Sequence, residues 1–61
     1  MTLRELRENA MLKQEEVAKK LLVDQSAVSN WERGTAKPLR KYRKKLAKLY
    51  GVTVSEIEEA I

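Results

Sequence analysis

The chain has 61 residues and a net charge of +4, and this length allows one domain at most, spanning residues 1–61. It contains no cysteine and no histidine, so the usual metal ligands and the commonest general base are missing, and we expect neither an enzyme nor a metal or cofactor site. No apolar run approaches the roughly 18 residues that cross a bilayer, and Met1 leads directly into charged sequence without a signal peptide, so the expected location is the cytoplasm.

Two helices are expected in the N-terminal part of the chain. Thr2 and Glu5 form a capping box, in which each side chain can satisfy a backbone N–H of the other residue, and they open a helix that runs to about Ala10. Apolar residues recur with a helical period there and again from Gln14 to about Leu21. The residues that share the apolar face of the second helix are Val17, Ala18 and Leu21.

A third helix is expected to begin at Gln25 and to end before Gly34. Asp24 is a favourable N-cap, and Gly34 can adopt the left-handed conformation that commonly follows a helix. Only residues 22–24 separate this helix from the second one, and so short a connection forces a sharp reversal of the chain. The arrangement predicts a helix-turn-helix.

The rest of the chain predicts two further helices. One runs from about Leu39, after Pro38, to Tyr50 and stops at Gly51, and a short last helix opens with a second capping box, Thr53–Glu56. The residues expected to face inward are Tyr42, Leu46 and either Leu49 or Tyr50 in the fourth helix, and Ile57 and Ile61 in the fifth. The aromatic residues, which we interpret as packing residues and not as platforms for single-stranded bases, are Trp31, Tyr42 and Tyr50. No segment alternates with a period of two, so the predicted fold class is all-α, a compact five-helix bundle.

Positive charge is concentrated in one block. Residues 33–48 hold eight cations and no anion, whereas residues 1–32 hold five cations and six anions. The cations of the block are Arg33, Lys37, Arg40, Lys41, Arg43, Lys44, Lys45 and Lys48. Such a block suggests a polyanionic partner, although a solvated helix face explains it equally well from charge alone.

The exposed face expected for the third helix is made of polar side chains of short or medium length. With Val28 and Trp31 turned inward, no lysine or glutamate interrupts this face between Gln25 and Ser29. Its members are Gln25, Ser26, Ser29, Asn30 and Arg33. Glutamine and asparagine can form two hydrogen bonds with adenine, arginine can do so with guanine, and serine can bond either base. The pattern therefore favours base recognition over a neutral surface without a role.

Three segments of the chain carry a resemblance to a known family: Leu12–Ala18, Val23–Gly34 and Lys37–Pro38. Together they resemble the phage repressor/Cro-like (Xre) helix-turn-helix family, and the resemblance continues through Leu46–Val52 and the closing helix. It implies a lambda-repressor-like fold and sequence-specific binding of double-stranded DNA. The helix at about residues 25–32 would enter the major groove.

The resemblance also implies roles for individual residues. Gln25 and Ser26 would be the leading base contacts, and Ser29 and Asn30 would follow. Contacts to phosphate are implied for Gln14, Arg7, Arg33, Lys37 and Arg40. Arg7 and Glu32 match a charged pair that ties the first helix to the end of the third.

The chain departs from the family pattern in its turns and in its fourth helix. Met11 and Leu22 stand where glycine or another small residue is common, and a Cβ costs about 1–2 kcal/mol if the backbone there stays left-handed. Alternatively, Leu22 adjusts the turn and adds apolar area. Positive residues also stand near positions where relatives often carry leucine, namely Arg40, Arg43 and Lys44. Tyr42 is expected to take over that packing.

The resulting hypothesis is a transcriptional regulator that acts as a repressor and binds an operator as a homodimer. One helix reads too few base pairs, and two copies about 34 Å apart are the usual solution. Two alternatives stay open, a DNA-binding antitoxin of a toxin–antitoxin pair and a protein-interaction bundle that has lost operator binding. The polar face of the third helix argues against the last of these, because protein interfaces favour apolar or aromatic anchors. Ile57, Ala60 and Ile61 fit either a dimer contact or the core.

Overall fold

The computed structural model describes all 61 residues and contains five α-helices and no strand. The helices are α1 (Leu3–Asn9), α2 (Gln14–Leu21), α3 (Gln25–Arg33), α4 (Arg40–Tyr50) and α5 (Val54–Ala60). The prediction of an all-α five-helix bundle is therefore confirmed. Each helix lies where the capping signals and the apolar spacing place it.

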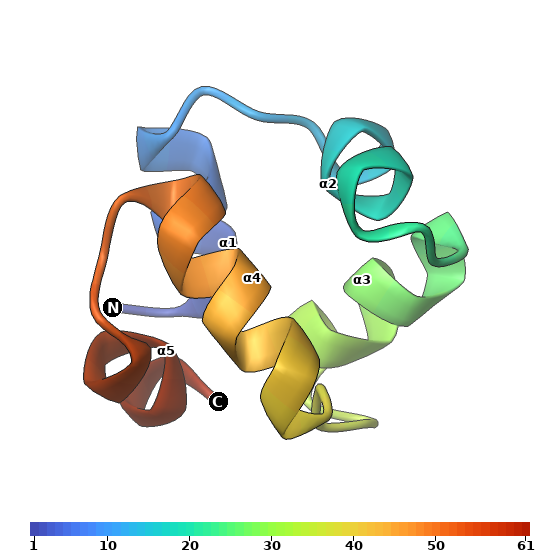
Figure 1. Ribbon diagram of the computed structural model, residues 1–61. Helices are drawn as coiled ribbons and strands as arrows, with labels where there is room; N and C mark the ends of the chain where they lie inside the picture. Colours follow the sequence, from blue (N-terminus) through green and yellow to red (C-terminus); the bar gives the residue numbers. More distant parts are fainter.

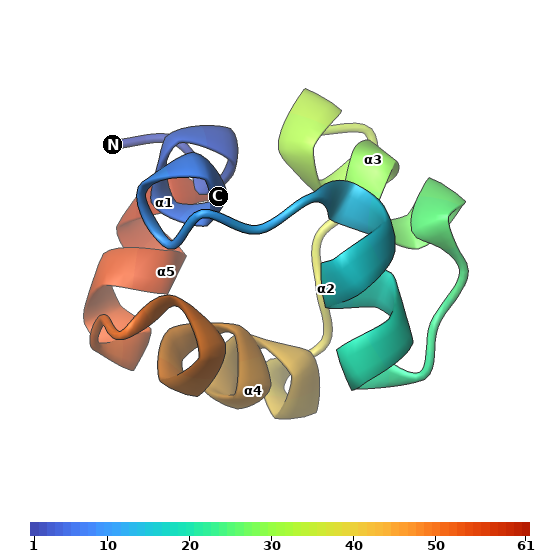
Figure 2. The same ribbon diagram turned by 90° about the horizontal axis from the view of Figure 1, so that it is seen from above.

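The helices form two groups that α1 joins. α2 packs chiefly against α3, α4 packs chiefly against α5, and α1 contacts both α3 and α4 (Figure 1). Figure 2 shows α3 and α4 on opposite sides of the molecule, with α2 beside both. The outer faces of α3 and α4 therefore point in different directions.

The core contains apolar side chains from all five helices. Its buried members are Leu3, Leu6, Val17, Ala18, Leu21, Val28, Trp31, Leu46, Ala47, Tyr50 and Ile57. Tyr42 is half-buried, and its ring centroid lies 5.6 Å from that of Trp31, so it packs as expected for an aromatic replacement of leucine. Ile57 is completely buried, and Ala60 and Ile61 pack against the core. The fifth helix therefore uses Ile57 within the monomer and not in a dimer contact.

Both predicted capping boxes are present. At α1, the Thr2 hydroxyl accepts the Glu5 N–H at 3.1 Å, and the Glu5 carboxylate accepts the Thr2 N–H at 2.8 Å. The same reciprocal bonds join Thr53 and Glu56 at the start of α5, at 3.1 and 3.3 Å. Asp24 occupies the N-cap position of α3 as predicted, but its side chain makes no capping hydrogen bond.

Four residues that follow helices or lie in the turns have left-handed backbone. Gly34 and Gly51 end α3 and α4 with φ of 79° and 71°, as their sequence positions predict. Met11 and Leu22 adopt φ of 59° although they carry a Cβ, and their side chains are 89% and 88% exposed. The alternative in which Leu22 adjusts the turn and buries apolar area is therefore wrong. The turn is left-handed at Leu22, and the leucine side chain extends into solvent.

Replacing Leu22 with glycine is expected to stabilise the domain by about 0.5–1 kcal/mol. Relief of left-handed strain contributes about 1–2 kcal/mol, and the larger entropy of glycine in the unfolded chain removes about 0.4–1 kcal/mol of this gain. For a domain of this size the melting temperature should rise by about 2–8 °C. Circular dichroism on heating measures the change. Leu22→Ala is the matched control, because it shortens the same exposed side chain but keeps the Cβ, and it should give no gain.

Candidate nucleic-acid interface

The polar face of α3 contains the four residues expected to contact bases. Gln25 and Ser26 lie in the first turn and are exposed, whereas Ser29 and Asn30 lie one turn later and are half-buried. Val28 and Trp31 are buried on the opposite side of the helix. The helical repeat of 3.6 residues places the four polar residues within one outward arc. Their side chains are therefore available to a ligand that approaches α3, most freely at its N-terminal end.

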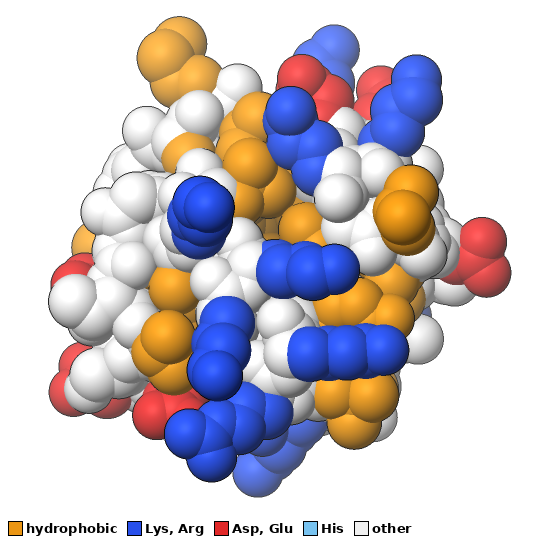
Figure 3. Space-filling model, in the orientation of Figure 1, with side chains coloured by type: hydrophobic (Ala, Val, Ile, Leu, Met, Phe, Trp, Pro, Cys, Tyr) orange, Lys and Arg blue, Asp and Glu red, His pale blue; other side chains and the backbone are white.

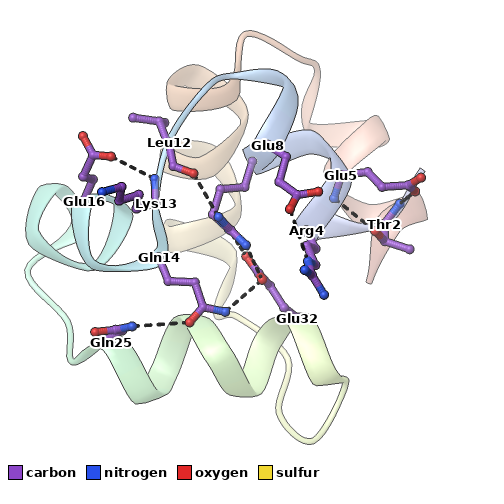
Figure 4. Close-up of polar contacts among 11 residues, drawn as sticks. Thr2, Arg4, Glu5, Glu8, Leu12, Lys13, Gln14, Glu16, Gln25 and Glu32 are labelled. Carbon is purple, nitrogen blue, oxygen red and sulfur yellow. Dashed lines mark hydrogen bonds and ion pairs between the residues drawn. The ribbon is translucent and has the colours of Figure 1, made fainter.

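Gln14 connects the two ends of α3 on the surface of the domain. It is the first residue of α2, and its Oε1 accepts a bond from Nε2 of Gln25 at 3.5 Å. Its own Nε2 donates to Oε1 of Glu32 at 3.0 Å (Figure 4). These bonds fix which end of the Gln14 amide faces each partner. They also restrict Gln25, the residue expected to lead the base contacts.

Arg7 and Glu32 form an ion pair that ties α1 to the end of α3. Nε and Nη2 of Arg7 donate to the two carboxylate oxygens of Glu32 at 2.6 and 3.2 Å, and Nη1 donates to the carbonyl of Leu12 at 2.9 Å (Figure 4). The two side chains are only 12% and 6% exposed. The hydrogen bonds to Glu32 raise the pKa of Arg7, and this effect outweighs the opposing effect of burial. Because every nitrogen of the guanidinium is engaged, the geometry supports a structural role for Arg7 over a phosphate contact.

Tyr50 lies in the core close to the same ion pair. Its side chain is buried, and this burial raises the pKa of its hydroxyl far above the ordinary value of about 10. The negative charge of Glu32 raises this pKa further, and the positive charge of Arg7 opposes the increase. The folded protein therefore holds the Tyr50 proton more tightly than the unfolded chain does.

The free energy of unfolding is expected to fall as the pH rises past about 10. A group whose folded pKa is raised contributes stability below its unfolded pKa, and this contribution is lost as the pH climbs toward the folded value. Tyr50→Phe removes the titrating group. Between pH 9.5 and 11, the free energy of unfolding of this variant should therefore fall by about 1 kcal/mol less than that of the parent. Urea titrations across this range measure the difference.

The cations nearest to α3 lie at its end and in the connection that follows. Arg33 is the last residue of α3, Lys37 lies in the connection, and Arg40 is the first residue of α4; all three are exposed. Arg33 also donates to the side-chain oxygen of Asn30. No acidic residue lies between Glu32 and the end of α4. A phosphate near the end of α3 would therefore meet positive charge without local repulsion.

The remaining cations of the block face elsewhere. Four exposed lysines recur three or four positions apart along α4, opposite its buried stripe, and they are Lys41, Lys44, Lys45 and Lys48. Figure 3 shows lysine and arginine side chains over α4, on the side of the molecule opposite α3. Arg43 is half-buried and donates to the carbonyl of Pro38 at 2.9 Å and to Glu58 at 3.5 Å. The cations of the block therefore do not form one surface. Some lie near the end of α3, the lysines lie on the outer face of α4, and Arg43 makes a structural contact.

Sequence reasoning did not predict the hydrogen bonds of Gln14 or the contacts of Arg43. Gln14 bonds residues that lie 11 and 18 positions away, and Arg43 pairs with a residue 15 positions away. No periodic signal marks such pairs, because they depend on the angles at which the helices cross. The one sequence signal for an internal partner of Arg43 is its position, because it places a positive charge next to the apolar stripe of α4.

A three-residue turn between α2 and α3, a polar outer face on α3 and neighbouring exposed cations define the helix-turn-helix class of DNA-binding domain. A family model described as helix-turn-helix, of the Xre and lambda-repressor-like type, matches residues 3–57. The chain belongs to this family, which consists of DNA-binding domains of transcription regulation and not of enzymes. No curated protein and no solved structure was found to match it. No helix has the length and apolar character needed to cross a membrane.

Proposed function

We propose that this domain reads double-stranded DNA by placing α3 in the major groove, with Gln25 and Ser26 as the first base contacts and Ser29 and Asn30 as the next. The observation that carries the proposal is the state of the Gln25 amide. One hydrogen of its Nε2 is directed to Gln14, while its Oε1 accepts no bond within the protein. An outward acceptor beside a second amide hydrogen matches the N6 and N7 edge of adenine. The contact with Gln14 limits the rotation of this edge before DNA arrives.

The phosphate contacts that we propose flank this reading edge. Gln14 offers its second amide hydrogen and the free N–H groups at the start of α2, which suit an anion. Arg33, Lys37 and Arg40 supply positive charge beyond the other end of α3. Arg7 is left out of this set, because its guanidinium is bonded to Glu32 and Leu12.

We further propose that the protein is a repressor that binds its operator as a homodimer. A single α3 contacts only a few base pairs, so two copies on half-sites about 34 Å apart would supply the missing specificity. Selection of bound duplexes from a random library tests the proposal. Enrichment of a consensus with two inverted half-sites at this spacing is expected. Recovery of unrelated sequences would contradict sequence-specific reading, and a single half-site would contradict the dimer.

Binding to the selected duplex should weaken steeply as salt is added. Three positively charged phosphate contacts per protomer, from Arg33, Lys37 and Arg40, predict a log–log slope of about −3, since each neutralised phosphate contributes about −0.9. Fluorescence anisotropy at several salt concentrations measures this slope. Lys37→Gln should reduce it by about 1. Lys44→Gln, an equal charge change on the outer face of α4, should leave it unchanged.

A further inference from the structure

A groove with a partly apolar lining lies between α2 and α4. It encloses about 380 Å³ and is lined by Lys20, Leu21, Lys45, Lys48 and Leu49. The groove exists because α2 packs chiefly on α3 and α4 packs chiefly on α5, so the seam between α2 and α4 is closed only by the core beneath it. Figure 3, in which α4 faces the viewer, shows hydrophobic atoms exposed among lysine and arginine side chains on this side.

The charges of this groove have no counterpart within the protein. Its lining contains three lysines and no acidic residue, and none of these lysines takes part in an ion pair. The second depression of the surface differs in both respects. Its lining contains two lysines and two glutamates but no hydrophobic residue, and is formed by Lys13, Glu15, Glu16 and Lys19. Only the groove between α2 and α4 therefore combines an apolar part with an uncompensated charge.

This combination restricts what can occupy the groove. Phosphates of a duplex would match the lysines but would leave the exposed part of Leu49 without an apolar partner, whereas Leu21 already packs in the core. A small carboxylic acid would match one lysine and leave two unmatched. A helix with an apolar residue flanked by several carboxylates satisfies both features, because amphipathic helices place such residues on one face at intervals of three and four.

Leu22 provides a second observation beside the groove, although it is not one of the residues that line it. It directly follows the groove residue Leu21, so its Cα lies about 3.8 Å from that of Leu21. Its side chain is 88% exposed and its backbone is left-handed, so the chain keeps an apolar residue there at a cost in stability and without packing it internally. Strained residues of this kind are candidates for function.

We propose that this groove is the docking site for an acidic amphipathic segment of a partner protein. A leucine-sized side chain of the partner would pack against Leu49 and the adjoining Leu22, and the partner's carboxylates would pair with Lys20, Lys45 and Lys48. The apolar contact supplies affinity, while the ion pairs favour acidic partners and speed their encounter. This inference goes beyond DNA reading, since α3 stays free when the groove is filled.

The probe for this site is a synthetic helical peptide of about 15 residues with leucines at intervals of four and glutamates around them. Nuclear magnetic resonance spectra of the ¹⁵N-labelled 61-residue chain should show amide shifts confined to the groove residues. Lys20→Glu combined with Lys48→Glu should weaken binding by at least about tenfold, which corresponds to 1.4 kcal/mol. The matched control is Lys13→Glu with Lys19→Glu, the same charge change in the other depression, and it should bind as the parent does.

Further measurements separate docking from a loss of folding and from other occupants. Leu22→Gly should weaken peptide binding while raising the melting temperature, a combination that unfolding cannot produce. Equal binding of a peptide with glutamine in place of glutamate would overturn the proposal, as would amide shifts on α3. Displacement of the peptide by duplex DNA, or self-association that disappears in the Lys20 and Lys48 double variant, would also overturn it in favour of another occupant. The peptide assay needs no DNA, so its result is independent of the proposed operator binding.

Discussion

Replacement of Arg7 with alanine is expected to destabilise the domain by about 3–5 kcal/mol. Glu32 is only 6% exposed and would lose two hydrogen bonds, at 2.6 and 3.2 Å, while its charge stayed desolvated. The carbonyl of Leu12 would lose its partner as well. A domain of 61 residues has a total stability of roughly 3–9 kcal/mol, so this loss is a large part of the whole. Urea unfolding followed by circular dichroism measures it.

Two comparisons show whether the charge left in the interior causes the loss. Arg4 pairs with Glu8 at 3.4 Å with both side chains more than half exposed, so Arg4→Ala should cost no more than about 0.5 kcal/mol. Arg7→Met combined with Glu32→Leu removes both charges and should recover most of the stability, because apolar pairs of similar volume often replace buried ion pairs. Equal unfolding midpoints for Arg7→Ala and Arg4→Ala would mean that Arg7 contributes no more to stability than an exposed surface residue does.

Gln25→Ala is expected to relax the preferred base at one position of each half-site. Loss of a two-bond contact with adenine costs about 1–3 kcal/mol of discrimination, or about 5- to 150-fold. Folding should be little affected, because Gln25 is exposed and its only bond within the protein is the long one to Gln14. Binding to the selected duplex and to versions with one altered base pair measures the change, while affinity for random DNA should hold.

Asn30→Ala serves as the comparison on the same helix. Asn30 is half-buried and its side chain accepts a bond from Arg33, so its truncation should alter both base reading and one phosphate contact. The Asn30→Ala variant should therefore bind all duplexes somewhat more weakly than the parent does. If Gln25→Ala binds its site as tightly and as selectively as the parent, α3 is not the reading element.

The sequence predicts the helices well because each has a local signal. Thr2, Asp24 and Thr53 mark starts, Gly34 and Gly51 mark ends, and these signals act within a few residues of each other. The apolar stripes likewise predict which faces are buried, including those that carry Val28 and Ile57. Local chemistry and packing agree within the five helices, as natural sequences require for cooperative folding.

The parts that the sequence does not predict depend on how helices pack. The polar face of α3 indicates Gln25, and the family resemblance indicates Gln14. Only the crossing of α2 and α3 brings the amides of these two residues together. Two lysines of the groove, Lys45 and Lys48, belong to a charge block that the sequence presents as continuous, and the turn of α4 separates them from Lys37. The third, Lys20, comes from α2, outside this block. Leu22 misleads for a related reason, because hydrophobicity favours burial but the turn geometry directs this residue to solvent.

Met11 has a consequence for how new DNA specificities can arise in this domain. Substitutions on a recognition helix commonly cost about 1 kcal/mol of stability, which a small domain tolerates only once or twice. Met11 lies in the α1–α2 connection, outside both the reading face and the groove, and its left-handed backbone with an 89% exposed side chain gains from glycine. A chain that first acquires glycine there can accept costly changes at Ser26 or Ser29 and still fold. Under the proposed mode of DNA reading, the order in which mutations occur, as well as their identity, thus governs which DNA sequences descendants of this protein can bind.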